Sequence, residues 1–146
     1  MINNLRNLFT KCHKDAVKPV YELYGDAACS LRVVEDYSIK PGGRVLAATG
    51  LNIAIPEGFE AQIRPRSGLA WKKGLTVVNT PGTIDSNYRG EIKVALINLG
   101  DETVRINKGD AVAQMKFSAV YLGNFIEVNS LSETPRGDGG FGSTGK

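Results

Sequence analysis

From residue 31 onward the chain alternates short apolar runs, rich in β-branched residues, with turns of glycine, proline, asparagine and aspartate. Short, closely spaced runs of this kind are typical of a sandwich, barrel or jelly roll. No long helical pattern separates them, which excludes a βαβ fold. The pattern therefore predicts an all-β fold, with strands at residues 31–34, 45–48, 51–55, 61–64, 75–78, 92–98, 103–106, 111–117 and 120–128.

Two segments depart from the strand pattern. Residues 67–73 lack β-branched side chains and precede a glycine, which predicts one or two helical turns capped by Ser67 and ended by Gly74. Residues 2–14 predict a short amphipathic helix within an N-terminal extension, residues 1–16. The apolar residues that recur there at helical spacing are Ile2, Leu5, Leu8, Phe9 and Cys12.

Composition bounds the class of protein. A chain of 146 residues with 42% apolar and 23% charged residues fits one soluble domain, and a net charge of +3 is too small to indicate nucleic-acid binding. No run of apolar residues is long enough to span a membrane. Cys12 and Cys29 form no zinc or disulfide pattern, so we expect two reduced thiols in a cytoplasmic protein without a nucleic-acid or membrane partner.

The C-terminal residues 129–146 are rich in glycine and have little to bury. They predict a flexible arm that becomes ordered on a partner or ligand. The sequence GFGSTGK matches the glycines and lysine of a phosphate-binding loop, but a true loop of that kind follows a strand and opens a helix. Backbone N–H groups beside Arg136, Ser143 and Thr144 still suit polyphosphate oxygens, and a merely solubilising tail is the alternative.

Three internal segments carry polar side chains suited to binding. Arg66 and Ser67 begin the expected short helix, where free N–H groups attract anions, although a solvated turn explains them equally well. The stretch 79–91 predicts a long hairpin that reads a planar base edge, or simply a turn-rich connection. Gln114, after the Lys-Gly-Asp turn, is a weaker third candidate.

Taken together, these segments resemble motifs of the trimeric dUTPase family. PRSGLAWKKG, NTPGTIDSNYRGE, KGDAVAQM and RGDGGFGSTG resemble its motifs two to five in order and spacing, and the similarity runs from about residue 24 to 146. The resemblance implies a jelly-roll-like β-barrel over residues 17–128 and a homotrimer with shared active sites. It also implies hydrolysis of dUTP to dUMP and pyrophosphate, which limits uracil in DNA and supplies dUMP.

The resemblance also implies roles for individual residues. Asp85 corresponds to the general base that activates water, and Tyr88 to the tyrosine that excludes a ribose 2′-hydroxyl. The residues that resemble the uracil pocket are Asn79, Gly82, Thr83, Ile84 and Lys93. Those that resemble ligands of a magnesium-chelated triphosphate are Arg66, Ser67, Gly68 and Gln114. In the fifth motif, Arg136 resembles the γ-phosphate contact, Phe141 the uracil cover, and Gly142, Ser143 and Thr144 further ligands.

One motif departs from the family pattern. The usual Ala-Gly-x-Asp-Leu corresponds here to Ala-Ala-Cys-Ser-Leu, which places Ser30 where a carboxylate normally helps to hold hydrated magnesium. Asp26 lies nearby and is a candidate to compensate. Two alternatives stay open: a dCTP deaminase, which typically carries Arg-Ser-Ser rather than Arg-Ser-Gly, and a dUTPase-like nucleotide-binding protein with a mainly regulatory role.

Overall fold

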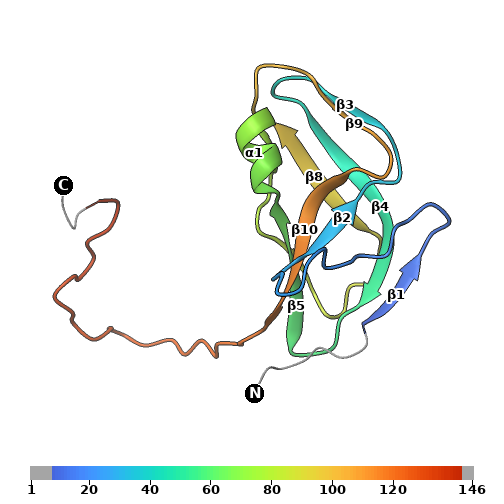
Figure 1. The fold of residues 1–146 in the computed structure, drawn as a ribbon. Helices are drawn as coiled ribbons and strands as arrows, with labels where there is room; N and C mark the ends of the chain where they lie inside the picture. Colours follow the sequence, from blue (N-terminus) through green and yellow to red (C-terminus); the bar gives the residue numbers. More distant parts are fainter. Residues whose placement is uncertain (1–7, 143–146) are drawn as a thin grey trace.

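The computed structural model describes residues 8–142, which form a β-rich body from which a long C-terminal segment departs (Figure 1). Three sheets make up the body, in the orders β1-β4-β8-β6, β2-β10-β5-β7 and β3-β9. The elements are β1 (Phe9–Cys12), β2 (Cys29–Arg32), β3 (Tyr37–Ile39), β4 (Arg44–Ala54), β5 (Phe59–Pro65), α1 (Ser67–Lys73), β6 (Leu75–Val77), β7 (Gly82–Ile84), β8 (Ile92–Asn98), β9 (Val104–Ile106) and β10 (Ala111–Ala119).

The strands alternate between a buried and a more exposed face, as the sequence pattern requires. In β8, Ile92, Val94 and Leu96 are buried while the residues between them are not. Such side chains from both four-stranded sheets form one continuous apolar core. Burial of this branched apolar surface is the main stabilising contribution to the fold.

The prediction of an all-β fold is confirmed, but the barrel is not closed. Within residues 8–142, the backbone pairings leave β1 and β6 as the edges of one sheet and β2 and β7 as the edges of the other. The expected strands at 45–48 and 51–55 are one strand, β4, which is interrupted by a bulge between Ala48 and Leu51. The short strands β3 and β7 were not predicted.

The strand expected at 120–128 is wrong. The last pair between β10 and β5 joins Ala119 to Phe59, the first residue of β5, so the partner strand ends there. Val120 still donates its N–H to Gly58 O at 2.9 Å, and residues 121–138 are exposed. This segment leads away from the body (Figure 1).

The helix expected near the N-terminus is also wrong where the structure describes it. Residues 9–12 form β1, which pairs antiparallel with β4, so that Phe9 faces Ala54 and Cys12 faces Leu51. Pairing with an available sheet edge overrides the weak preference of such a short segment for helix. Residues 1–7, which carry the start of this prediction, lie outside the described residues.

The helix expected at 67–73 is confirmed, but its N-cap is Arg66 rather than Ser67, and no side chain caps it. Its end at Gly74 is as predicted: this residue has φ of +66° and donates its N–H to Ala70 O. A Cβ atom at Gly74 would lie 2.3 Å from the backbone N of Gly100, so close packing as well as conformation requires glycine. In the part of the chain described, no helix is long and apolar enough to cross a membrane.

Candidate functional site

A row of three polar residues crosses the sheet that contains β10. Gln114 on β10 pairs with Ser30 on β2 and with Arg64 on β5, so the three lie side by side. The Gln114 side chain donates from Nε2 to Pro65 O at 2.9 Å, which fixes the orientation of its amide. Together with Asp26 and Arg66, this row lines a hollow of about 340 Å³.

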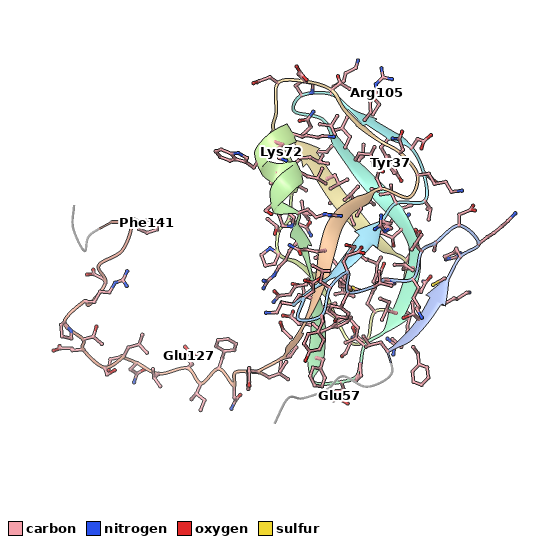
Figure 2. All side chains as sticks on the ribbon, viewed as in Figure 1. Tyr37, Glu57, Lys72, Arg105, Glu127 and Phe141 are labelled. Atoms are coloured by element: carbon pink, nitrogen blue, oxygen red, sulfur yellow. The ribbon has the colours of Figure 1, made fainter. Side chains whose placement is uncertain are left out.

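The start of α1 adjoins this row. Arg66 donates from Nη1 to Ala111 O at 3.4 Å and thereby links the helix to β10. Arg66, Ser67, Gly68 and Gln114 line a second hollow of about 600 Å³, where the cationic side chains of Lys72, Lys73 and Arg105 outnumber the one carboxylate, Asp110. Figure 2 shows Lys72 on α1 and Arg105 on the β3–β9 ribbon. The excess of positive charge suits a polyanion.

The chain between β6 and β8 crosses from one sheet to the other. It leaves the edge of the first sheet after Val77, forms β7 against β5, and returns at Ile92. Asn79 lies against Gly82, because a Cβ atom there would be 3.2 Å from Asn79 Nδ2. Thr83 and Ile84, which pair with Gln62 and Ala61, continue β7, while Lys93 is exposed on β8 with its Nζ 3.7 Å from Glu91 Oε2.

The end of this crossing segment is folded on itself around Tyr88. The Tyr88 hydroxyl donates to Glu91 O at 2.8 Å, and its N–H donates to Asp85 O at 3.1 Å. Its ring covers Gly90, where a Cβ atom would lie 2.4 Å from the Tyr88 hydroxyl oxygen. Asp85 is exposed and lines a hollow of about 440 Å³ together with Phe59.

Asp85 and the cationic hollow lie at opposite ends of β5. Ile84 pairs with Ala61, so Asp85 is level with Glu60, whereas Arg66 follows the other end of the strand. Six residues of extended chain separate these levels, which corresponds to about 20 Å. Within one chain, therefore, the structure brings Arg66 and Gln114 together but keeps Asp85 and Tyr88 apart from them.

The residues of the fifth motif are remote from both groups. Arg136 donates from Nε to Gly139 O at 2.8 Å, within the arm itself. Phe141 is fully exposed near the end of the arm, far from the body in Figure 2, and Gly142 follows it. Ser143 and Thr144 lie outside the described residues.

A comparison with known protein families shows which family the chain belongs to. The family model for dUTPase matches residues 14–145, a span that includes the crossing segment between β6 and β8, the cationic hollow and the arm. The chain belongs to the dUTPase family. It is 57% identical over 136 residues to the deoxyuridine 5′-triphosphate nucleotidohydrolase of Wolinella succinogenes, covering 93% of this chain and 91% of that protein. The corresponding protein of Hydrogenobaculum sp. is 54% identical over 142 residues, covering 97% of this chain and 99% of that protein.

Solved structures agree on the fold. The dUTPase of Staphylococcus bacteriophage 80alpha with dUPNHPP matches with a TM-score of 0.89 at 24% identity, covering 97% of this chain and 99% of the other. A dUTPase variant from phage phi11 of S. aureus, whose structure describes the coordination of a structural Mg(II) ion, matches with a TM-score of 0.79 at 20% identity, covering 85% and 97%. The arrangement of sheets in the present chain is thus that of the dUTPase family.

The first-motif region of this dUTPase offers few acidic ligands. Residues 8–142 contain no group of three or more His, Cys, Asp or Glu side chains that could hold a metal ion. Asp26, which shares a hollow with Ser30, accepts a hydrogen bond at Oδ2 from Leu23 N at 2.9 Å. Next to Ser30, burial raises the pKa of the Cys29 thiol, which donates to Met115 O at 3.4 Å and remains protonated at neutral pH.

Two cationic residues near the site were not predicted from the sequence. Arg64 and Lys116 line the same hollow as Ser30 and Gln114. Both lie two residues from a predicted site residue: Arg64 is on β5, two residues before Arg66, and Lys116 is on β10, two residues after Gln114. The alternation of side chains along a strand is the signal that could have identified them.

Proposed function

We propose that the chain hydrolyses dUTP to dUMP and pyrophosphate by attack of water on the α-phosphorus. Besides membership of the family, the observation that carries this proposal is the cationic hollow formed by Arg66, Ser67, Gly68 and Gln114. These residues come from segments far apart in the sequence and converge beside β10. A polyphosphate is the ligand class that such a group binds, because guanidinium and backbone N–H donors match phosphate oxygens.

The crossing segment at 79–91 supplies the base and sugar contacts in this proposal. Asn79 and the backbone from Gly82 to Ile84 offer donors and acceptors to uracil, and Lys93 borders the pocket. Cytosine would leave some of these groups unpaired, which costs enough to discriminate strongly between the bases. Tyr88, held by its hydroxyl, presents its ring to the deoxyribose and excludes a 2′-hydroxyl.

Asp85 is the proposed general base. It is exposed, as a residue that must reach a substrate water requires, and it follows directly after β7. Its carboxylate accepts a proton from the water as the water oxygen bonds to the α-phosphorus and the bond to the β-phosphate oxygen breaks. Arg66 and Gln114 stabilise the negative charge that moves onto the leaving pyrophosphate.

A complete site on this account needs more than one copy of the chain. The separation of about 20 Å along β5 is too large for Asp85 and Arg66 to contact the same α-phosphate from one copy. A closed, symmetric trimer would bring Asp85 of one copy to Arg66 of another. The arm, with Arg136, Phe141 and Gly142 and with Ser143 and Thr144 beyond the described residues, would close over the nucleotide and exclude bulk water.

The residues present fit a magnesium ion that is held mainly by the triphosphate. Magnesium keeps several waters and needs only one or two protein ligands besides phosphates, which agrees with the lack of an acidic cluster in residues 8–142. When bound, it neutralises charge on the phosphate oxygens. Ser30 of the first motif and the neighbouring Asp26 line the hollow beside Gln114, and Ser30 contributes no charge.

The two reduced thiols favour action in the cytoplasm, or in the host cytoplasm for a viral protein. Neither nucleic acid nor membrane is an expected partner.

The direct test is pyrophosphate release from dUTP, with dCTP, dTTP and UTP as comparators, in a magnesium titration. We expect turnover of dUTP alone, and loss of turnover in Asp85→Asn, which keeps the shape of the side chain but cannot accept the proton. Asp101→Asn, at an exposed carboxylate between β8 and β9, is the matched control. Deamination of dCTP, or binding of dUTP without turnover, would contradict the proposal.

A further inference from the structure

We infer that Asn52, beside the bulge in β4, is a positioning residue for Tyr88 and so for the choice between deoxyribose and ribose. The inference rests on the proposed role of Tyr88. It concerns a stretch of β4 within TGLNIAIPEG, residues 49–58, a segment that shares the resemblance to the family but lies outside motifs two to five. Three polar groups within four residues of β4 each bond to a different residue just after Tyr88.

The bulge is what makes these groups available. On β4, Ala48 pairs with Lys93 and Leu51 pairs with Ile92, so Thr49 and Gly50 are extra residues with no partner on β8. Gly50 has φ of +66°, and its N–H is turned away from the regular ladder. A bulge of this kind redirects backbone and side-chain groups that regular pairing would use.

Each redirected group contacts the chain between Tyr88 and β8. The Thr49 hydroxyl donates to Ile92 O, and the Gly50 N–H donates to Glu91 Oε1 at 2.9 Å. One residue past the bulge, the Asn52 side chain donates from Nδ2 to Arg89 O at 2.9 Å. The chain on the C-terminal side of Tyr88 is therefore held against β4 at three points, two backbone carbonyls and the Glu91 carboxylate.

The amide of Asn52 is itself oriented from the other side. Its Oδ1 lies 3.1 Å from His13 Nε2, which donates to it in the Nε2–H tautomer. His13 is in turn fixed by its backbone N–H, which donates to Gly50 O at 2.9 Å. With Oδ1 engaged by His13, the amide nitrogen faces Arg89 O.

The consequence reaches Tyr88 through the backbone. Arg89 O and Glu91 flank Gly90, the residue that the Tyr88 ring covers, and Glu91 O accepts the Tyr88 hydroxyl at 2.8 Å. If Arg89 O loses its bond to Asn52, the contacts of Thr49 and Gly50 still hold Glu91 and Ile92, but the turn through Arg89 and Gly90 is tied to β4 at two points instead of three. The ring remains present but its position varies, and a small displacement of a positioning group lowers rate and selectivity.

Asn52→Asp is the most informative variant, because it keeps the size and the acceptor for His13 but replaces the donor with an oxygen that repels Arg89 O. His13→Ala is a second, exposed variant that removes only the contact orienting the amide. Thr10→Val is the matched control: Thr10 lies on the neighbouring strand β1, and within residues 8–142 its hydroxyl donates to Leu8 O and forms no hydrogen bond to Tyr88, Arg89 or Glu91. The readouts are kcat/KM for dUTP and for UTP, together with the midpoint of thermal unfolding.

We expect Asn52→Asp to lower kcat/KM for dUTP by about tenfold, as the loss of one well-oriented hydrogen bond allows. The preference of Asn52→Asp for dUTP over UTP should be smaller than that of the unmodified chain. His13→Ala should lower this preference by a smaller factor, and Thr10→Val should leave it unchanged. An unchanged preference for dUTP over UTP in folded Asn52→Asp and His13→Ala would overturn the inference alone. Failure of the unmodified chain to prefer dUTP would overturn the proposed function, and the inference with it.

Discussion

Replacing Gly90 with alanine perturbs Tyr88 without touching the substrate directly. A Cβ atom at Gly90 would lie 2.4 Å from the Tyr88 hydroxyl oxygen, 2.6 Å from Cζ and 2.9 Å from Cε2. Non-bonded carbon atoms are comfortable at about 3.5–4 Å, so the ring must move by roughly 1 Å or more. Tyr88 is 42% exposed, and solvent gives it room to move.

The expected loss of stability in Gly90→Ala is small, whereas the expected loss of activity is large. Displacement of the ring breaks one hydrogen bond, from Tyr88 to Glu91 O, which costs about 1 kcal/mol of unfolding free energy. A displacement of about 1 Å in a positioning group can cost about 100-fold in rate. We therefore expect Gly90→Ala to remain folded while its kcat/KM for dUTP falls by about 10- to 100-fold.

The assay compares steady-state hydrolysis of dUTP and UTP with the thermal unfolding midpoint of the same preparation. Gly123→Ala is the control, because a Cβ atom at Gly123 meets nothing within 4 Å. Wild-type kcat/KM in Gly90→Ala would refute the argument that the ring position matters. A collapse of stability to the point of unfolding would show instead that the ring cannot move aside.

Three further predictions concern the body of the protein. Asn98→Ala should lower the free energy of unfolding by about 3 kcal/mol in denaturant titrations, because the buried amide donates to Ile39 O and Glu102 O and accepts from Gly100 N; a loss below about 1 kcal/mol would contradict this. Burial raises the pKa of Cys29 above its ordinary value of 9.0, so the folded state keeps its thiol proton where the unfolded state loses it. The stabilisation that this pKa difference of Cys29 adds to the free energy of unfolding should be fully present below pH 9.0. It should decrease as the pH rises towards the folded-state pKa. Cys29→Ala should flatten this decline, and an equal slope in the variant would exclude Cys29 as its source. Thiol labelling of the folded protein should modify exposed Cys12 and spare Cys29.

The local pattern of apolar and polar residues was sufficient to predict an element where one face of a strand meets the core. The bounds of β8 and the end of α1 at Gly74 follow from alternation and from the conformational freedom of glycine. Pattern failed where a partner decides the outcome. Residues 9–12 pair with an edge of β4, while residues 120–128 meet no strand of the same chain because β5 has ended.

In the candidate site, too, the sequence identifies individual residues but does not show which of them lie together. Side-chain chemistry and motif order identified Arg66, Gln114, Asp85 and Tyr88 as candidates, and their roles remain proposals. Which of them lie together depends on strand register, and register is set by long-range pairing that sequence alone does not reveal. The placement of Asp85 and Arg66 at opposite ends of β5 follows only from the pairing of β7 with β5.

The measurement that tests the account most directly mixes two inactive variants. Asp85→Asn and Arg66→Ala are each purified, unfolded together at equal concentration, refolded and assayed for dUTP hydrolysis, with each variant refolded alone as control. If a site takes Asp85 from one copy and Arg66 from another, random assembly restores both residues to about one quarter of the sites, and activity returns to about one quarter of the unmodified value. No recovery in properly refolded mixed assemblies would contradict the claim that copies share the site.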